Sequence, residues 1–391
     1  MSKQKIQFVL LAVSFVFFFA SCDAKGPFGP ALLKDSKVQV SPGPSIVFVP
    51  GYKGSELVQN TGEDSWRKVW LTPSQALGFS HPDLSYREGD GIQEGNVLGS
   101  VTLIPKVIDV QVYSPWLAAL RSSNRKPYVF PYDWRRDNGE ISKHLESFLE
   151  KVKSENGNIA PVVVGHSNGG NLTLSVLNRR PDLIGKAVFV GTPFHSGIGF
   201  MEDLIPGVST GLNGKIAGAC VVSTFVSVLT FFPRNQSFDT KDVLTTPTGE
   251  PIQVQFFQAK DWKRFQLGIY NKASGCRSEP SLESYQSNLD KALSFRNSLE
   301  PKKKGNLPPV LVVHAVNRPT LRTLPGEKKG EDWIWDFEKG KRVPGDGRVT
   351  AESSLPPDGI PYEIFVSEAE HSALLNDEKV QKKILDFAEK R

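Results

Sequence analysis

Short, uninterrupted runs of apolar residues recur along this chain and constrain its fold more than any other feature. Three of them are Ile46–Val49, Pro161–Val164 and Ala187–Val190. A strand that is apolar on both sides is typical of a sheet buried on both faces, which is usually parallel. Helical periodicity lies between these runs, at residues 116–120, 141–152 and 172–179. The alternation predicts an α/β fold with a mostly parallel central sheet covered by helices.

The alternation breaks down in the second half of the chain and then resumes. Strand patterns return at Pro309–Val313 and Tyr362–Val366, and a helical pattern follows from about Asp377 to Lys390. About 110 residues between two core strands are expected to form a cap or lid. We therefore assign residues 45–196 and 308–391 to the core and residues 197–307 to a cap insertion.

Three segments outside the regular pattern have specific interpretations. Residues from Ile216 to Phe232 carry no charge over 17 positions, which fits either a buried cap element or a lipid-facing surface. The stretch around Trp66 and Trp70 is expected to be a polar loop. The sequence EDWIWDFEKGKRV, which begins at Glu331, predicts a hairpin excursion.

The N-terminal residues have the layout of a secretory signal. Lys3 and Lys5 precede an uncharged run that ends at Cys22, and this run is too short for a comfortable membrane span. Small residues directly before Cys22 resemble a bacterial lipoprotein signal, with simple cleavage nearby as the alternative. We predict a signal peptide at residues 1–21, lipidation of Cys22 and a flexible tether at residues 22–44. The protein is then exported and membrane-anchored, in the periplasm or at the cell surface.

Charge and cysteine content give few indications of partners. A formal net charge of +5 does not favour a nucleic-acid partner, and the run Lys302–Lys304 is interpreted as a solvated loop. Besides Cys22 the chain has Cys220 and Cys276, which predict either a disulfide or two buried thiols in an exported protein. No spacing of His and Cys predicts a metal site, we expect no cofactor, and the oligomeric state is left open.

The segment PVVVGHSNGG, which begins at Pro161, places a serine between a strand and a helix. This is the context of the G-x-S-x-G nucleophile elbow, in which Gly165 and Gly169 allow neighbouring elements to approach a strained Ser167. Adjacent side chains point apart on such a turn. We therefore interpret Ser167 as a nucleophile and His166 as a local hydrogen-bonding residue.

A serine nucleophile needs a histidine base and a carboxylate that orients it. His371 fits the base because it lies in a polar loop between the last strand and the last helix. Asp346 fits the acid because glycines flank it in a loop after a resumed strand. His314 is expected in the core and His195 lies too near the elbow, whereas the remaining acids are interpreted as solvated: Asp332, Asp336 and Asp358.

Six motifs occur together and in order along the chain. They are VFVPGYKGSEL at Val47, FPYDWRRD at Phe130, GHSNGG at Gly165, VGTPFHSG at Val190, GDGRVTAESS at Gly345 and EHSALLND at Glu370. In these motifs the chain, from about Ile46 to its end, resembles the lecithin:cholesterol acyltransferase family, which includes acyltransferases and phospholipases A of the α/β-hydrolase fold. The resemblance implies the triad Ser167, Asp346 and His371, in agreement with the residue-level interpretation.

The resemblance also has limits at particular positions. Asn168 stands where the family usually has an apolar residue, which matters little if only its backbone N–H is used. Cysteines that brace the lid of some relatives are missing near Trp66 and Trp70. In PYDWR we expect Asp133 and Arg135 to pair and Trp134 to pack.

The predicted chemistry is acyl transfer through an acyl-enzyme on Ser167. We expect the backbone N–H groups of Tyr52 and Asn168 to form the oxyanion hole. The substrate is predicted to be a lipid ester, with water or an alcohol as acceptor. A small-ester esterase or amidase, and a non-catalytic surface lipoprotein that binds lipid or another ligand, are the alternatives.

Overall fold

The computed structural model describes residues 29–33, 43–62, 65–104, 108–234, 239–301 and 307–390. The predicted signal peptide, Cys22, most of the tether and the run Lys302–Lys304 lie outside these residues. In the part of the chain that is described, none of the helices combines the length and the apolar character needed to cross a bilayer.

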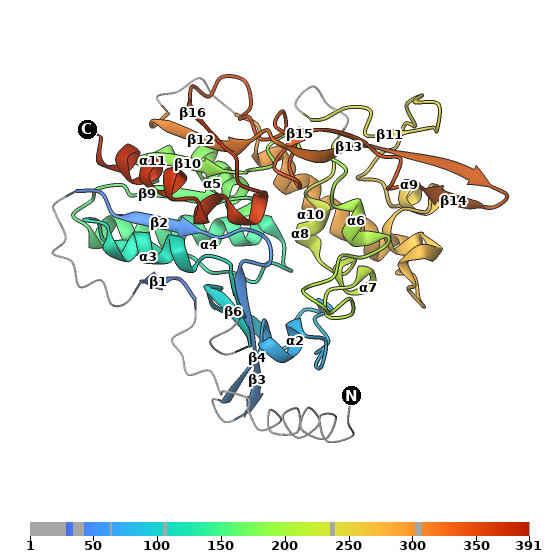
Figure 1. Cartoon of the computed structure of the whole chain (residues 1–391), viewed down its shortest axis with the longest axis horizontal. Helices are drawn as coiled ribbons and strands as arrows, with labels where there is room; N and C mark the ends of the chain where they lie inside the picture. Colours follow the sequence, from blue (N-terminus) through green and yellow to red (C-terminus); the bar gives the residue numbers. More distant parts are fainter. Residues whose placement is uncertain are drawn as a thin grey trace, which may run out of the picture.

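A mostly parallel sheet forms the centre of the molecule (Figure 1). Within the described residues its seven strands are, in sheet order, β1 (Ala31–Leu32), β8 (Pro127–Val129), β2 (Ile46–Val49), β9 (Val162–His166), β10 (Lys186–Val190), β12 (Val310–Ala315) and β16 (Glu363–Ser367). β1 pairs antiparallel with β8, and the other neighbours are parallel. The predicted α/β fold class is confirmed.

Helices cover both faces of this sheet. Successive strand residues point to opposite sides, and both sets are apolar, so each face needs a covering layer. Val47 and Val49 pack into a cluster with α4 (Asn138–Glu155) and α5 (Asn168–Arg179). Ile46 and Phe48 pack into a second cluster with α3 (Ser114–Ser122) and α11 (Glu378–Glu389). Because all four of these strand side chains are fully buried, the uninterrupted apolar pattern follows from burial on both faces.

The segment between β2 and β8 is folded rather than a loop, so the prediction of a polar loop around Trp66 and Trp70 is wrong. Besides α3, its elements are β3 (Ser55–Gly62), β4 (Ser65–Trp70), α2 (Pro73–Ala76), β5 (Ile92–Val97), β6 (Ser100–Ile104) and β7 (Ile108–Gln111). β3 lies between β4 and β5 in an antiparallel sheet, and β6 pairs with β7. Trp70 is buried edge-on against Trp134, with ring centroids 5.1 Å apart.

The cap insertion lies between β10 and β12. It contains α6 (Met201–Leu204), α7 (Ala219–Val222), α8 (Val226–Leu229), β11 (Leu244–Thr245), α9 (Ala259–Arg264), two 3-10 helices at Gly268–Tyr270 and Lys272–Ser274, and α10 (Leu282–Ser298). Figure 1 shows α6, α7 and α9 together, to the right of the central sheet. Phe225, Val228 and Phe232 are fully buried, so the uncharged run forms a buried cap element and not a lipid-facing surface.

After β12 the chain leaves the central sheet again before it reaches β16. The elements of this excursion are β13 (Arg318–Lys329), β14 (Asp332–Trp335) and β15 (Lys341–Gly345). β13 and β14 form an antiparallel hairpin with Lys329 opposite Asp332, and β15 pairs with the other end of β13, so the segment that begins at Glu331 belongs to a hairpin excursion as predicted. β15 ends directly before Asp346, and the 3-10 helix η4 (His371–Asn376) follows β16.

The PYDWR motif sits at a buried junction between the core and the β3–β5 segment. Arg135 is fully buried, with its Nη2 2.7 Å from Asp133 Oδ2 and its Nη1 2.8 Å from Asp90 Oδ2. The indole Nε1 of Trp134 donates to the carbonyl oxygen of Ser55 at 3.0 Å. The predicted pairing of Asp133 with Arg135 and the packing of Trp134 are confirmed, and Asp90 is a partner that the sequence did not reveal.

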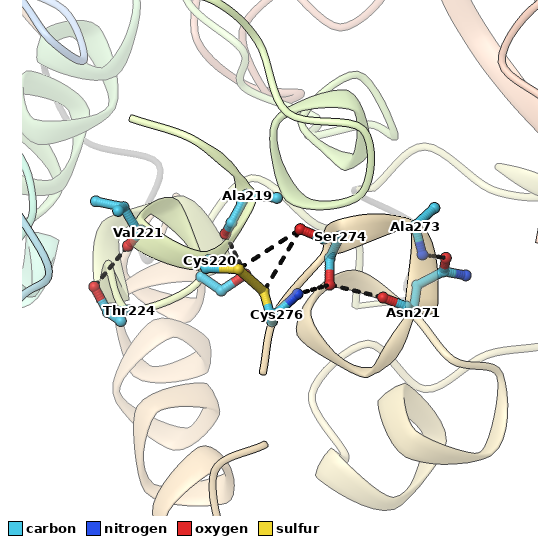
Figure 2. Close-up of a disulfide and its surroundings, with 9 residues drawn as sticks. Ala219, Cys220, Val221, Thr224, Asn271, Ala273, Ser274 and Cys276 are labelled. Atoms are coloured by element: carbon cyan, nitrogen blue, oxygen red, sulfur yellow. Dashed lines mark hydrogen bonds between the residues drawn. A yellow bond between two sulfur atoms is a disulfide. The ribbon is translucent and has the colours of Figure 1, made fainter. Parts of the chain in front are cut away.

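The cap contains a disulfide between Cys220 and Cys276, with Cα atoms 5.3 Å apart. Figure 2 shows the bond joining the α7 segment to the loop that follows Ser274. The two cysteines are 56 residues apart in sequence, so the bond closes a long loop inside the insertion. Such a closure limits the number of conformations open to the unfolded chain.

Reducing this disulfide is expected to lower the free energy of unfolding by about 4 kcal/mol, the chain-entropy value for a loop of this length. Urea unfolding with and without reductant measures the change, and the double variant Cys220→Ser/Cys276→Ser should be insensitive to reductant. Alkylation of both cysteines in the denatured, unreduced protein would contradict the bond.

Asp133→Ala is expected to lower the free energy of unfolding by about 1.5 to 3 kcal/mol, because the buried Arg135 guanidinium loses one of its two carboxylate partners and keeps Asp90. The matched control is Asp182→Ala, which removes a carboxylate that pairs with Arg180 at the surface and should change little. Equal effects of the two variants in urea unfolding would refute this account.

Candidate active site

Ser167 occupies a sharp turn between β9 and α5. Its φ of 53° and ψ of −121° are unfavourable for a residue with a side chain, so the surroundings must hold it there. A Cβ atom at position 165 would lie 2.7 Å from the carbonyl oxygen of Gly169, and one at position 169 would lie 2.3 Å from that of Val49. Both predicted glycines therefore stand where only glycine fits.

Two further glycines are needed around the site, one beside the Ser167 turn and one against Asp346 and His371. A Cβ atom at Gly170 would lie 1.9 Å from Thr192 Oγ1. Gly191 has a φ of +55°, and a Cβ atom there would lie 3.2 Å from both Asp346 Oδ2 and His371 Nδ1. Sequence reasoning missed both, although the doubled glycine of GHSNGG and the VGTP motif contain them.

The structure brings Ser167, His371 and Asp346 together from three loops that follow β9, β16 and β15. His371 Nε2 lies 3.0 Å from Ser167 Oγ, and His371 Nδ1 lies 2.7 Å from Asp346 Oδ2. The backbone N–H of His371 also donates to the carbonyl oxygen of Asp346 at 2.9 Å. These distances are within hydrogen-bond reach for a nucleophile, a base and an orienting acid.

The surroundings of Asp346 favour its ionised form. Burial alone would raise the pKa of this carboxyl, but the adjacent His371 imidazole and backbone N–H donors together hold the pKa below its ordinary value. The donors are the N–H groups of Val349 and Arg348, at 2.7 and 2.9 Å from Oδ1. Because a carboxylate only accepts, Nδ1 of His371 carries the proton and its Nε2 lone pair faces Ser167 Oγ. The arrangement can take a proton from the hydroxyl.

His166 connects two loops of the site. Its Nε2 lies 3.0 Å from the carbonyl oxygen of His371, and its Nδ1 lies 2.6 Å from the hydroxyl of Tyr113. A carbonyl oxygen only accepts, so Nε2 carries the hydrogen and Tyr113 donates to Nδ1. The same hydroxyl accepts from the N–H of Gly51 at 3.0 Å. Burial lowers the pKa of His166 to about 3, so the ring is neutral.

The other histidines and acids considered from the sequence have different surroundings. His314 is buried on β12, with Nδ1 3.0 Å from Ser354 Oγ. Asp332 pairs with Lys272 at 2.7 Å, and Asp336 accepts backbone hydrogen bonds in the turn after β14. Asp358 is exposed, and the backbone N–H of His195 donates to the carbonyl oxygen of Ser353.

The two residues expected to supply an oxyanion hole lie beside Ser167. Asn168 is the first residue of α5, where backbone N–H groups have no intrahelical acceptor. Tyr52 follows Gly51, and a Cβ atom at Gly51 would lie 3.0 Å from Ser167 Cβ. The ring of Tyr52 packs against Trp134 and the cap residues Phe200 and Phe231.

An ionic cluster around the buried Asp203 carboxylate joins the cap to two loops of the site. Asp203 on α6 pairs with Arg348 at 2.6 Å and lies 3.9 Å from Lys53 Nζ. Lys53 follows Tyr52, and Arg348 is two residues beyond Asp346, so one carboxylate contacts both loops. Burial lowers the pKa of Lys53, and the charge of Asp203 opposes that shift. Local sequence gave no sign of this contact across 145 residues.

The described part of the chain contains no group of three or more His, Cys, Asp or Glu residues arranged to hold a metal ion. The proton-transfer arrangement at Ser167 is built from side chains and backbone of the chain itself.

Comparison with solved structures supports the fold. The chain is similar to a chain of the Tle4–Tli4 complex, with a TM-score of 0.57 and 13% identity over 90% of this chain and 100% of the other. It is also similar to the mature Bacillus licheniformis lipase BlEst2, at a TM-score of 0.40 and 11% identity, covering 93% of this chain and 99% of the lipase. Carboxylesterase CesB from Bacillus subtilis is similar at a TM-score of 0.33 and 13% identity, covering 98% of this chain and 96% of the carboxylesterase. No curated protein matches the chain.

The family comparison is specific to one part of the sequence. The lecithin:cholesterol acyltransferase profile matches residues 56–305, which include Ser167 and most of the cap, whereas Asp346 and His371 lie beyond the match. This match covers more than half of the 391 residues. The protein has the α/β-hydrolase fold, and its family is one of ester-hydrolysing and acyl-transferring enzymes. On this evidence the chain belongs to the lecithin:cholesterol acyltransferase family.

Proposed function

We propose that this protein is a serine-dependent lipase, phospholipase A or O-acyltransferase that acts on fatty acyl esters of phospholipids. The observation that carries the proposal is the continuous hydrogen-bonded arrangement of Ser167, His371 and Asp346 in a member of this family. A hydroxyl, an imidazole and an ionised carboxylate in this order are the parts that acyl transfer requires.

The first half of the proposed cycle forms an acyl-enzyme. Ser167 Oγ attacks the ester carbonyl carbon while His371 Nε2 takes the hydroxyl proton, and Asp346 stabilises the imidazolium. The negative charge that develops on the carbonyl oxygen is received by the backbone N–H groups of Tyr52 and Asn168. As the tetrahedral intermediate collapses, Nε2 returns the proton to the departing glycerol oxygen.

The second half resolves the acyl-enzyme. Water or an alcohol attacks the acyl carbon while His371 Nε2 takes its proton, and Ser167 Oγ leaves and regains that proton. Water gives a free fatty acid and an alcohol gives a new ester. The choice depends on which acceptor the cap admits next to Ser167.

The surroundings of Ser167 favour a long apolar acyl group. The serine is only 6% exposed, and the aromatic residues Tyr52, Phe200 and Phe231 pack together where the cap meets the oxyanion loop. The rings of Phe200 and Phe231 stack with centroids 4.0 Å apart. Apolar walls of this kind gain free energy from covering an acyl chain, which a small polar ester does not offer.

Ser167→Ala, His371→Ala and Asp346→Asn are each expected to lower the hydrolysis of fatty acyl esters by about 10⁴-fold or more, because each removes one part of the proton-transfer chain. The matched control is Asp358→Asn at an exposed acid, which should leave the rate unchanged. Initial rates on phospholipid vesicles measure the change, and thermal unfolding checks that the variants fold.

Labelling and product analysis separate this proposal from its alternatives. A fluorophosphonate probe should label wild type at Ser167 and leave Ser167→Ala unlabelled. Absence of labelling would indicate a binding protein, and turnover confined to short soluble esters or amides would indicate a small-ester enzyme. Products formed with and without an added long-chain alcohol distinguish acyl transfer from hydrolysis. Wild-type turnover by Ser167→Ala would disprove the assignment.

We also propose that the protein is exported and anchored to a membrane through Cys22. The mature chain is expected to begin at a lipid-modified Cys22, which mass spectrometry of the N-terminal peptide detects, because an acylated cysteine holds a protein at a bilayer. Cys22→Ser should abolish the modification and release the protein from the membrane fraction. A mature N-terminus at any other residue would overturn the anchor.

A further inference from the structure

A buried polar network connects the two loops that supply the proposed oxyanion hole. The hydroxyl of Tyr132 donates to the carbonyl oxygen of Pro50 at 3.0 Å and accepts from Asn168 Nδ2 at 3.2 Å. Pro50 lies two residues before Tyr52, and Asn168 directly follows the nucleophile. The Tyr132 hydroxyl is therefore hydrogen-bonded to both loops that supply the proposed oxyanion donors.

The state of this hydroxyl suits the role. Burial raises the pKa of Tyr132, and the hydrogen bond from Asn168 only partly offsets the shift, so the phenol stays protonated at neutral pH. A protonated hydroxyl can donate to a carbonyl oxygen and accept from an amide at the same time. Tyr132 is only 3% exposed, so water is poorly placed to replace either partner.

The network extends from Asn168 into the cap. Asn138 and Asn168 exchange two amide hydrogen bonds, each 3.0 Å long, and both side chains are fully buried. Asn138 Nδ2 also donates to Thr230 Oγ1 at 2.9 Å, and the threonine hydroxyl donates to the carbonyl oxygen of Ser227. Thr230 and Ser227 belong to the cap insertion, so the chain of hydrogen bonds runs from Pro50 to the cap.

We propose that Tyr132 and Asn168 are positioning residues, which set the separation of the two oxyanion donors, and that Asn138 and Thr230 hold this pair against the cap. The inference rests on the proposed function. Oxyanion donors are effective only within about half an ångström of their required positions, so a spacer between the two loops affects the rate without touching substrate. Asn168 then has two roles: its backbone N–H is an oxyanion donor, and its side chain helps to position that donor relative to the one at Tyr52.

Tyr132→Phe tests the proposal most directly. The kcat for a soluble fatty acyl ester should fall by about 10-fold with little change in KM, because the loss is confined to the oxyanion-bearing state. A long-chain trifluoromethyl ketone, whose adduct with Ser167 carries an oxyanion, should bind more weakly by a similar factor. Tyr128→Phe removes another tyrosine hydroxyl, one whose partners are Glu155 and Asn156, and should change neither quantity.

A double-mutant cycle tests whether the two side chains act through one position. Tyr132→Phe and Asn168→Ala together should lose no more kcat than the larger single loss, since either change breaks the same link. Unchanged kcat in both single variants, measured well below their melting temperatures, would overturn the proposal, as would fully additive losses. If Tyr132→Phe does not fold, Asn168→Ala with the ketone measurement decides between the same outcomes.

The controls separate failure of this inference from failure of the proposed function. If wild type is labelled by fluorophosphonate at Ser167 and Tyr132→Phe reacts with the probe and the ketone as wild type does, the spacer role is wrong and the enzyme assignment stands. If wild-type turnover does not depend on Ser167, the assignment itself fails, and the spacer role fails with it.

Discussion

Close contact between backbones at the turn around Ser167 is the constraint on which the site depends. β9 and α5 approach the loop after β2 so closely that a Cβ atom at Gly169 would nearly overlap the carbonyl oxygen of Val49. On the other side, a Cβ atom at Gly170 would clash with the Thr192 side chain in the loop after β10. Since the turn is enclosed by the backbone at the end of β2 on one side and by the Thr192 side chain on the other, Ser167 is held at a positive φ, and the hydroxyl faces His371.

The cap is attached to this rigid centre through polar contacts of two kinds. Asp203 is an ionic link to the loops that carry Lys53 and Arg348, whereas Thr230 is a neutral hydrogen-bonded link to Asn138. The disulfide from Cys220 to Cys276 lies wholly within the cap and restricts its internal freedom. A shift of the cap relative to the core must therefore break buried polar bonds, which is unfavourable unless the groups find new partners.

Local patterns were sufficient to predict the parts of the site that a single loop presents. Ser167 and His371 each follow a strand of the central sheet, so their convergence at one edge could be inferred from the strand pattern. Asp346 follows β15, which lies outside that sheet, and was selected by its flanking glycines and its motif. Two contacts could not be inferred from local sequence: that of Tyr132 with Asn168 and that of Asp203 with Arg348. The residues around each partner show no pattern that indicates the other. The strands around Trp66 and Trp70 were missed because polar residues interrupt their apolar pattern, as in SELVQNTG at β3.

The neutrality of His166 has a consequence for how acid–base measurements on this protein can be read. Its ring lies 5.1 Å from that of His371, and two neighbouring imidazoles that both titrated would share protons and give apparent constants that belong to neither. Because His166 remains uncharged until strongly acidic conditions, it takes up no proton near neutral pH. A histidine titration seen near neutral pH, in a rate profile or in ring resonances followed by NMR, would then not be that of His166.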